Sequence, residues 1–408
     1  MTKFIKNTFI IFFILIIFTS KGFSQKSIII FKTDYSNNYM NYAIYDLIIK
    51  NIFLYSNLKI MNSYSNYSSY NKIKSQIKKL TINNNANISI AYQIQNFKNG
   101  ILINYIIFDN EKPNEWIEKS AYSKEEDLFF SINKILKDIY EISKIKNKIT
   151  YIKEKDYISL LGYYSQKIIL TNNEDNIYKL FYDFHKDNIY FNIDYLEYLT
   201  DKSDRTSVDI INDLIKNMQN YINKKKNHYY LYSLGCMHYG KYKVNVILSD
   251  IEASIENYNK ALKLKNNYYK YYYRLANAYI LKNDYDNAIK YYEEAIKLNE
   301  YDINIIKEFV SLLKRDINKN GNEVISYLKK IIEINKNDEE ALEEISKLYE
   351  KIGDYDNALI YYNKLFEVIN YNLYIINNET KDADAYDRYI FKRNSIKLNI
   401  ESLNKKIF

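Results

Sequence analysis

Histidine and cysteine are the residues that most often bind metals or act as nucleophile and base, and this sequence has few of them. Its 408 residues contain His185, His228, His238 and one cysteine, Cys236. Cys236 and His238 are two positions apart, which places them on different faces of a helix and makes them a poor ligand pair. One cysteine also excludes an internal disulfide. We therefore predict no metal site, no cofactor and no enzymatic activity.

Adjacent acidic residues are the other candidates for acid and base chemistry. Glu125-Glu126, Glu293-Glu294 and Glu343-Glu344 are such pairs. Neighbouring residues on a helix diverge by about 100°, so these pairs are typical of a solvated helix face. The sequence has no glycine-rich phosphate loop and neither of the common hydrolase motifs, His-Glu-x-x-His and Gly-x-Ser-x-Gly.

The charge pattern also argues against a nucleic-acid partner. The formal net charge of +8 is spread over 58 basic and 50 acidic residues and does not gather in a basic block. The chain has one proline and seven glycines, so it contains few residues that would interrupt a helix. We expect a folded, helix-rich protein whose partner is a protein or a peptide.

The elements that would form a binding surface are repeats. The pentapeptide Asp-Tyr-Asp-Asn-Ala occurs at Asp284–Ala288 and again at Asp354–Ala358, and a Tyr-Tyr pair follows each copy at the same offset. The starting positions differ by 354 − 284 = 70 residues. This is about two periods of a helix-pair repeat of roughly 34 residues, which predicts an α-solenoid.

From Asn266 onward the sequence resembles the tetratricopeptide repeat, in which small and large residues alternate at fixed positions of helix A and helix B. The resemblance implies that the two helices approach closely at small residues such as Ala276 and Ala288, with an aromatic ring between them. Gly353 would occupy the turn between the helices, where positive φ is often needed. The predicted packing positions are Tyr272, Leu275, Ala276, Tyr279, Ala288, Tyr292 and Ala295 in one repeat, and Leu342, Ile345, Tyr349, Gly353, Ala358 and Tyr362 in another.

Two further copies depart from this pattern. Residues 303–338 carry Val324 and Ile331 where small residues are expected, and we predict a longer turn near residues 318–322. An earlier copy begins at residue 228, but the segment Lys241–Asp250 separates its helix A from its helix B. We expect looser helix packing in the first case and an insertion in the second.

In tetratricopeptide arrays the helix A positions line the concave binding surface, and the resemblance implies the same surface here. Tyrosine and lysine side chains hold a peptide by ring stacking and charge-assisted hydrogen bonds. The predicted partner-binding groove consists of Tyr229, Tyr232, Lys270, Tyr273, Asn277, Asn304, Lys307 and Lys314.

The region before the repeats predicts a small α/β domain with a mixed sheet. Its hydrophobic periods predict the order β-α-β-α-β-β-β-α between Ser27 and Ile142. In that order, together with Ile30-Phe31 and Asn87-Ile88-Ser89-Ile90, it resembles the N-terminal domain of the Tol-system propeller protein and related domains of curli-type secretion pores. The expected strands are 27–32, 58–61, 86–96, 100–108 and 115–121, and the expected helices are 39–55, 70–80 and 124–142.

The first 24 residues have the composition of a secretory signal peptide. Lys3 and Lys6 supply the positive charge, Thr8–Phe18 is an apolar run, and residues 22–24 offer small side chains for cleavage. The run is shorter than the about 20 residues of a membrane span. We predict cleavage after Ser24 and a mature chain with no membrane span, with an uncleaved anchor as the alternative.

These patterns give an α+β protein in which a small mixed-sheet α/β domain precedes an all-α solenoid of the tetratricopeptide type. The predicted parts are a signal peptide (1–24), the α/β domain (25–143), a helical connector or degenerate repeats (144–227), the repeats (228–372) and a C-terminal capping helix (373–408).

Our leading functional hypothesis is an exported, non-enzymatic protein of the bacterial envelope, periplasmic or envelope-associated, whose repeats bind a protein partner. A second hypothesis is an assembly factor that docks through the α/β domain and uses the repeats as a spacer. An enzyme with its site in the α/β domain is the third.

Overall fold

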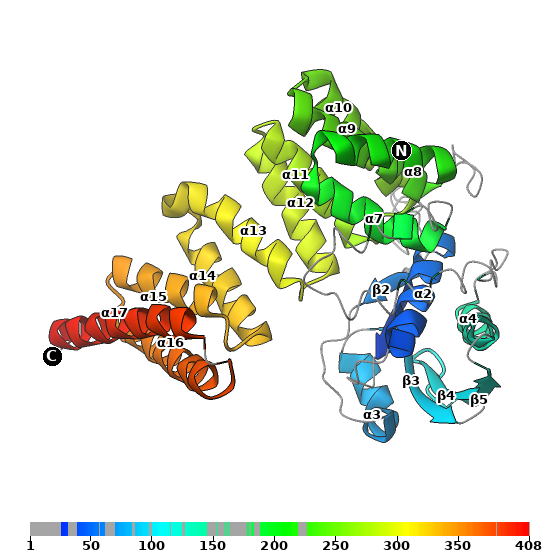
Figure 1. Cartoon of the computed structure of the whole chain (residues 1–408), viewed down its shortest axis with the longest axis horizontal. Helices are drawn as coiled ribbons and strands as arrows, with labels where there is room; N and C mark the ends of the chain where they lie inside the picture. The colour runs from blue at the N-terminus through cyan, green and yellow to red at the C-terminus, as the bar shows by residue number, and fades with distance from the viewer. Residues whose placement is uncertain are drawn as a thin grey trace, which may run out of the picture. The chain divides into compact units, whose positions relative to one another are not determined.

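The computed structural model forms two compact units, Met1–Tyr271 and Tyr272–Phe408, whose boundary lies within helix α11 (Tyr269–Leu281) (Figure 1). The structure describes residues 26–31, 39–56, 58–61, 70–83, 86–97, 100–114, 116–124, 127–144, 152, 160, 163, 178, 181–182, 188–218, 227–380 and 382–407. The predicted signal peptide and most of the predicted connector, including His185, lie outside these residues.

The first unit opens with the predicted α/β domain. Its elements follow one another as β1 (Ser27–Phe31), α2 (Tyr39–Tyr55), β2 (Lys59–Met61), α3 (Tyr70–Asn83), β3 (Ile88–Phe97), β4 (Gly100–Asp109), β5 (Trp116–Ser123) and α4 (Leu128–Ile142). The sheet has the order β2-β1-β3-β4-β5. Strands β1, β2 and β3 are parallel, and β3, β4 and β5 are antiparallel. The predicted element order and the mixed sheet are confirmed.

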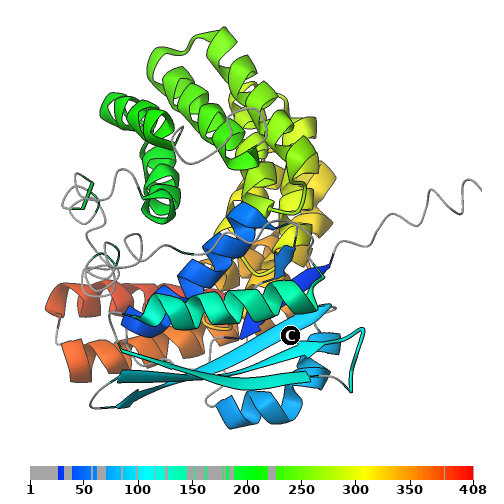
Figure 2. The same cartoon turned by 90° about the vertical axis from the view of Figure 1, so that its right-hand side faces the viewer.

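Helices cover both faces of this sheet. Figure 2 shows α3 on one face and α2 with α4 on the other. On the α3 side, Ile73 and Ile77 form a buried cluster with Ile29, Phe31 and other apolar residues of β1, β3 and β4. Strand β5 is an edge strand, and its Trp116 and Tyr122 are exposed. The domain is therefore well packed at its centre and open at the β5 edge.

Helices that follow the α/β domain complete the first unit. They are α7 (Ile189–Lys202), α8 (Arg205–Met218), α9 (His228–Asn245) and α10 (Leu248–Leu264). Helix α7 packs on α2, where Asn51 Nδ2 donates to Tyr190 Oη at 3.1 Å and Lys50 Nζ lies 2.8 Å from Asp194 Oδ1. The α/β domain is thus joined to these helices by buried polar contacts.

The second unit is entirely helical in the residues that the structure describes. After α11 it contains α12 (Tyr285–Leu298), α13 (Ile303–Leu313), the short 3-10 helix η1 (Lys314–Asp316), α14 (Ile317–Ile334), α15 (Glu339–Lys351) and α16 (Tyr355–Ile375). A π-helical segment, η2 (Ile376–Thr380), leads to the last helix, α17 (Ala383–Ile407). The pairs α11–α12, α13–α14 and α15–α16 are helix hairpins with the order expected of an α-solenoid.

The small residues of the repeat lie inside these hairpins. Ala276, Ala288, Ala295 and Ala358 have no exposed surface. The large packing residues Leu275, Tyr292, Leu342, Ile345, Tyr349 and Tyr362 are also buried, whereas Tyr272 and Tyr279 are half-buried and stack near Tyr291. Since a methyl group is all that separates the backbones at the alanine positions, the hairpins can approach closely there.

The turns of three hairpins have one backbone shape but different residues. Asn283, Gly353 and Val246 each end a helix A in the left-handed region, with φ of 59°, 81° and 57°. The next residue caps helix B: Asp284 and Asp354 accept a hydrogen bond from a backbone N–H, and Ile247 has no side chain that can. A side chain in the left-handed region costs about 1–2 kcal/mol, and a missing N-cap costs about 1 kcal/mol.

The two irregular copies differ from their sequence-based expectation. In the copy at 303–338 there is no long turn at residues 318–322; they belong to the first turns of α14, and η1 makes the connection. Asn320 Nδ2 donates to Leu313 O at 3.1 Å, which holds the start of α14 against the end of α13. In the copy at 228 the extra segment Lys241–Asp250 forms no loop of its own, because α9 and α10 are extended to meet at Val246-Ile247.

The C-terminal helix packs along the last hairpin. In α17, Ile396 and Leu403 are buried, Tyr389 and Lys406 hydrogen-bond to α15, and Lys406 Nζ also lies over the ring of Tyr355 at the start of α16. The predicted start of the cap at residue 373 is too early, because α16 continues to Ile375. Among the described residues, no helix is both long enough and apolar enough to cross a membrane.

Candidate functional site

Helices α11, α13 and α15 of the second unit form one face, here called the A-helix face. This face carries the polar residues of the candidate binding surface. Asp302 and Asp338 fix the starts of α13 and α15 by accepting hydrogen bonds from Ile305 N (3.4 Å) and Ala341 N (3.0 Å). By fixing where each helix begins, these caps also fix which of its residues point toward the neighbouring helix A.

A hydrogen-bonded cluster links α11, α12 and α13 on this face. Tyr273 Oη donates to Glu308 Oε1 at 2.9 Å. Tyr292 Oη lies 2.5 Å from Asn277 Oδ1 and 3.0 Å from Glu308 Oε2. Burial raises the pKa of Tyr273, and the lowering influence of Arg274 does not reverse the shift. Tyr273 and Tyr292 thus meet at the carboxylate of Glu308, a residue outside the predicted groove, and the predicted groove residue Asn277 joins the cluster through Tyr292.

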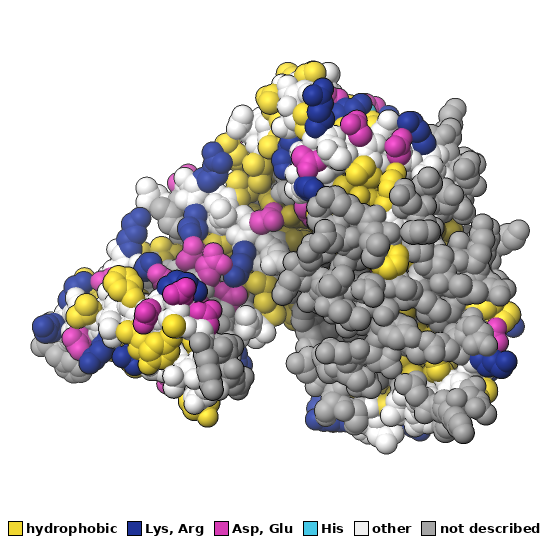
Figure 3. All heavy atoms as spheres, viewed as in Figure 1, with side chains coloured by type: hydrophobic (Ala, Val, Ile, Leu, Met, Phe, Trp, Pro, Cys, Tyr) yellow, Lys and Arg dark blue, Asp and Glu magenta, His cyan; other side chains and the backbone are white. Residues whose placement is uncertain are grey.

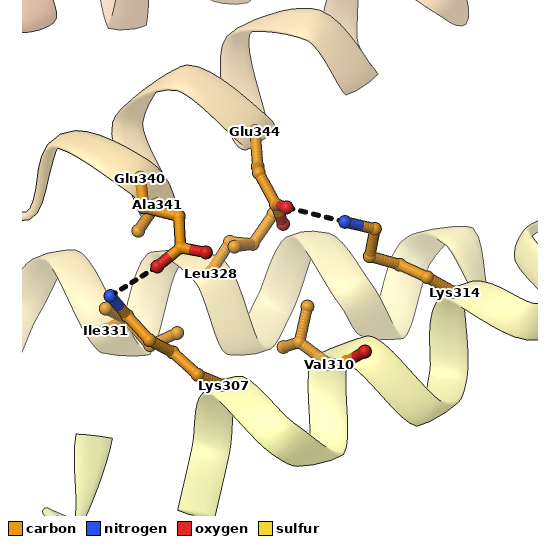
Figure 4. A pocket seen from close by; sticks show the side chains of 9 residues that line it. Lys307, Val310, Lys314, Leu328, Ile331, Glu340, Ala341 and Glu344 are labelled. Carbon is orange, nitrogen blue, oxygen red and sulfur yellow. Dashed lines mark hydrogen bonds and ion pairs between the residues drawn. The ribbon is translucent and has the colours of Figure 1, made fainter. Parts of the chain in front are cut away.

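Two ion pairs link α13 to α15 (Figure 4). Lys307 Nζ lies 2.8 Å from Glu340 Oε2 and 3.1 Å from Asp338 Oδ2, and Lys314 Nζ lies 2.5 Å from Glu344 Oε1. Burial alone would lower the pKa of Lys307, but its hydrogen bonds to Glu340 and Asp338 outweigh burial and raise that pKa. Lys307 is therefore charged, and each of the two lysines already has an acidic partner within the chain.

A cavity of about 110 Å³ lies between these ion pairs. Its sides are Lys307, Lys314, Glu340, Glu344 and Ser311, and its floor is made by Val310, Leu328, Ile331 and Ala341 from three helices. Figure 4 shows the ion pairs on either side of this floor, and Figure 3 shows acidic and basic side chains interleaved over α13–α15. The site offers both charges and a small apolar surface. This combination suits a short polypeptide segment.

Comparison with known proteins agrees with the hairpin pattern. Two family models described as tetratricopeptide repeat match residues 269–302 and 339–372. The chain carries two tetratricopeptide repeats. Each repeat is one hairpin, α11–α12 and α15–α16, and the cavity lies between the hairpin α13–α14 and helix α15 of the second repeat. No curated protein sequence matches the chain.

Solved structures similar to the chain include two described proteins. One is titled "Crystal structure of MamA", is 22% identical, covers 40% of this chain and 91% of its own, and has a TM-score of 0.32. The other is titled "Crystal structure of YrrB: a TPR protein with an unusual peptide-binding site", is 16% identical, covers 46% and 89%, and has a TM-score of 0.29.

The last tetratricopeptide repeat is covered by α17. Lys392 Nζ lies 2.6 Å from Glu339 Oε2 and 3.7 Å from Glu343 Oε2, and Tyr389 Oη donates to Glu339 Oε1 at 2.7 Å. Burial opposes ionisation of Glu339, but the bonds from Lys392 and Tyr389 lower its pKa. The helix A position Glu343 is therefore occupied by an internal partner, and the open part of the A-helix face lies at α13.

Two of the predicted groove residues are corrected by the structure. Tyr229 and Tyr232 are 1% and 0% exposed, so they do not line an open surface. Tyr232 Oη donates to Glu197 Oε1 of α7 at 2.6 Å, and its ring lies 4.5 Å from that of Tyr271. Helix α7 precedes the repeats in the chain, and the repeat pattern gives no sign that it covers this part of α9.

The remaining predicted groove residues have different surroundings. Lys270 belongs to the first unit and lies 3.7 Å from Glu197, so it is part of the same packed region as Tyr232. Asn304 is exposed at the start of α13. The residues that the prediction missed are Glu308, Glu340 and Glu344. They lie 35, 33 and 30 residues after their partners Tyr273, Lys307 and Lys314, so a spacing of about one repeat is the signal that could have found them.

A buried amine joins the first repeat-like hairpin to the α/β domain. Lys265 Nζ donates to Phe53 O at 2.7 Å and to Ser56 O at 2.8 Å, at the C-terminal end of α2, where carbonyls lack partners within the helix. The same nitrogen lies 5.1 Å from the centre of the Phe53 ring. His228 packs on Phe53 at 5.2 Å, and its Nδ1 lies 2.7 Å from Tyr271 Oη.

Burial changes the titration of both basic groups at this joint. It lowers the pKa of Lys265 to about 7. Burial, and then the charge of Lys265, lowers the pKa of His228 to about 3, so this imidazole is neutral near pH 7. The contacts of both groups lie between α2 and the helices that follow the α/β domain, and they hold these parts of the first unit together.

The remaining histidine and cysteine side chains do not form a metal site in the part of the chain that the structure describes. No group of three or more His, Cys, Asp or Glu there could hold a metal ion. Cys236 is buried, and Tyr258 Oη donates to its Sγ at 3.5 Å. His238 Nδ1 lies 3.1 Å from Asp250 Oδ1 on the next helix.

Proposed function

We propose that this chain is an exported, non-enzymatic protein of the bacterial envelope that holds a protein partner on the A-helix face of its second unit. The observation that carries the proposal is the cavity between Lys307–Glu340 and Lys314–Glu344. It is a small cavity with an apolar floor and an ion pair on each side, in an array whose repeats belong to a family that presents such faces to partners.

The charge arrangement points to an extended segment with an apolar side chain and polar groups on both sides of it. The apolar side chain would pack against Val310, Leu328 and Ile331, which are only 3%, 2% and 0% exposed, so its own burial and the flanking charged groups would supply most of the binding free energy. An acidic or basic group of the partner would exchange with one member of an existing ion pair. Such exposed pairs are worth only about 0–1 kcal/mol, so the exchange costs little.

Site-specific photo-crosslinking tests the proposal in the full chain. A benzophenone amino acid replaces Ser311, which is exposed and lines the cavity, and in the matched control it replaces Ser326, which is exposed on α14. Ser326 is two positions before Leu328 of the cavity floor, a rotation of about 200° around the helix, so Ser326 points away from the cavity. We expect a protein adduct from an envelope extract at Ser311 and none at Ser326. Equal adducts at both positions, or none at Ser311, would refute the assignment.

The exported setting depends on residues 1–24 and has its own test. We expect N-terminal sequencing of the chain recovered from its native cell to begin at Gln25, and the chain to fractionate with the periplasm or envelope. A chain that retains Met1 and stays with the cytosol would remove this part of the proposal while leaving the partner site intact.

A second candidate function is favoured by the open β5 edge. Trp116 and Tyr122 lie on this edge strand and are 51% and 57% exposed, and an unpaired strand edge can add a partner strand. This arrangement supports an assembly factor that docks through the α/β domain, in keeping with the resemblance to Tol-system domains. A benzophenone at Tyr122 separates the two: adducts there and none at Ser311 would favour docking through the sheet.

A further inference from the structure

The turn between α9 and α10, here called the α9–α10 tip, consists of three consecutive apolar residues that face solvent. Val246, Ile247 and Leu248 are 71%, 51% and 59% exposed. In Figure 1 the α9–α10 hairpin lies at the top of the view, and Figure 3 shows hydrophobic side chains at that edge. Single exposed apolar residues are ordinary, but an uninterrupted group at the end of a hairpin usually marks an interaction site.

The α9–α10 tip has residues that its own backbone disfavours. The two family-matched repeats make the same turn with Asn283-Asp284 and Gly353-Asp354, which suit the left-handed and N-cap positions. The tip makes it with Val246-Ile247, a β-branched residue at positive φ followed by a cap without a side-chain acceptor. Local preferences that are broken at an exposed position commonly indicate a functional requirement.

The extra residues of this hairpin lengthen it without disturbing its packing. Val246 follows His238 by eight residues, whereas Asn283 follows the equivalent Tyr279 by four. The extension is thus four residues in α9, about one helical turn, and it leaves the buried faces in phase. The first repeat-like hairpin therefore carries the α9–α10 tip one turn beyond the length of the matched repeats.

The shape of the α9–α10 tip suits a fluid apolar phase better than a groove in a protein. Its three residues pass from left-handed through extended to helical backbone, so their side chains do not share one face. Protein grooves bind helices through residues at i, i+3, i+4 and i+7, or strands through alternate residues. Lipid acyl chains impose no such spacing.

The residues one turn behind the α9–α10 tip suit a membrane interface. Lys241, Tyr242 and Lys243 form the last part of α9, and Lys243 is exposed. The nearest acidic side chain of α10, Asp250, is half-buried and lies 3.1 Å from His238 Nδ1. Tyrosine and lysine are the residues that settle at the headgroup level of a bilayer, where lysine attracts anionic lipids.

We propose that the α9–α10 tip inserts among the lipid headgroups of a membrane surface, with Lys241 and Lys243 against anionic headgroups. This assignment rests on the first unit alone and is independent of the partner site at α13. A single small apolar element gives reversible attachment, so the tip would act together with a second contact.

Fluorescence of a reporter at the α9–α10 tip tests insertion directly. The reporter is Ile247→Trp in a Trp116→Phe background, which removes the one native tryptophan. The full chain is mixed with vesicles of phosphatidylethanolamine and phosphatidylglycerol that carry nitroxide-labelled lipid. We expect a blue shift and quenching, because the indole leaves water. A reporter at Ile352 serves as control, since Ile352 is exposed in the equivalent turn of a matched repeat.

A second variant separates insertion from a folding defect. Val246→Asn with Ile247→Asp recreates the Asn-Asp turn of residues 283–284. Because these residues fit the turn, we expect a higher unfolding temperature together with at least a tenfold loss of vesicle affinity. Phosphatidylcholine vesicles or high salt should weaken binding of the native chain several-fold, since both remove the attraction to lysine.

Three results would overturn the proposal. They are an Ile247→Trp reporter that stays in water when vesicles are added, equal quenching of the Ile352→Trp control, and full vesicle affinity in the Asn-Asp variant. If a photo-crosslinker at Ile247 forms adducts with a protein and none with lipid, the α9–α10 tip binds a protein groove and the lipid assignment is wrong.

Discussion

Tyr232 and Tyr273 occupy the same position of helix A, two residues before Leu234 and Leu275, but they serve different purposes. Tyr232 is sealed in the first unit, with its hydroxyl on Glu197. Tyr273 is half-buried on the A-helix face of the second unit, with its hydroxyl on Glu308 of the next helix A. The repeat pattern fixes where a residue stands on its helix, and the neighbouring element decides whether that residue is core or surface.

In the first unit, α7 covers Tyr229 and Tyr232 of α9, and α7 itself packs on α2. Glu197 of α7 accepts from Tyr232, and Asn192 O of the same helix accepts from Tyr229 Oη at 3.3 Å. No such helix covers α13 within the described residues of the second unit, where lysine and glutamate form the surface. Helix α7, which lies outside the repeats, thus buries a helix A position that would otherwise line the groove.

The largest expected difference between the two regions is the loss of unfolding free energy when the ring of Tyr232 or Tyr273 is removed. Tyr232→Ala should lower the free energy of unfolding by about 3–5 kcal/mol, because a fully buried ring leaves a cavity. Tyr273→Ala should cost clearly less, since its ring is partly in water. Urea unfolding of the full chain, followed by circular dichroism, measures both. Equal losses would mean that both positions are core and that the contrast is wrong.

A smaller difference is expected at the small residue of helix A. Gly235 stands where the matched repeat has Ala276, and a Cβ there would lie 2.4 Å from Tyr258 Cδ1. Gly235→Ala should therefore destabilise by about 1–3 kcal/mol through overpacking. Ala276→Gly, the reverse exchange, should cost about 1 kcal/mol from helix propensity. If Gly235→Ala instead raised the free energy of unfolding, helices α9 and α10 would be spaced as widely as α11 and α12.

The buried amine of Lys265, which joins the end of α10 to the end of α2, should make the stability of the first unit depend on pH. The folded pKa of Lys265, about 7, lies below its ordinary value of 10.5, so between these values the unfolded state binds more protons. Stability should therefore rise from pH 7 to pH 9, by at most about 1.4 kcal/mol per pH unit. Thermal unfolding measures it, with Lys265→Met as control. A rise that persists in Lys265→Met would assign it to another group.

The smallest effect is expected for an ion pair of the open A-helix face. Lys314 and Glu344 are 43% and 31% exposed, so their coupling in a double-mutant cycle should be below about 1 kcal/mol and should fall in high salt. The variants are Lys314→Ala, Glu344→Ala and both together, compared by urea unfolding. A salt-independent coupling of several kcal/mol would mean that this surface is closed.

Most of the fold could be predicted from the period of the hydrophobic residues. The features that could not be predicted have physical causes. The α/β element order follows from alternating short apolar runs and helical stripes, because each element is set by its own residues. The burial of Tyr229 and Tyr232 could not be predicted, since α7 lies outside the repeats. The extension of α9 and α10 was hidden for a similar reason: Lys241–Asp250 breaks the repeat period while its residues remain compatible with helix.

The open cavity was predicted only in part. Lys307 and Lys314 were expected on this surface because their helix A positions are known from the repeat. Their partners Glu340 and Glu344 were missed, because an ion pair between successive hairpins depends on how one hairpin is rotated against the next. The joint at Lys265 gives no sequence signal at all, since a single lysine 209 residues from Ser56 reveals nothing about its partner.

The single thiol of this chain lies between the two helices of the first repeat-like hairpin, with no exposed surface. A reagent in solution can modify Cys236 only after α9 and α10 separate. The rate of labelling is therefore a clock for the opening of that hairpin, built into the native sequence. In an oxidising compartment the same enclosure protects the thiol from cross-linking to other molecules for as long as the hairpin stays closed.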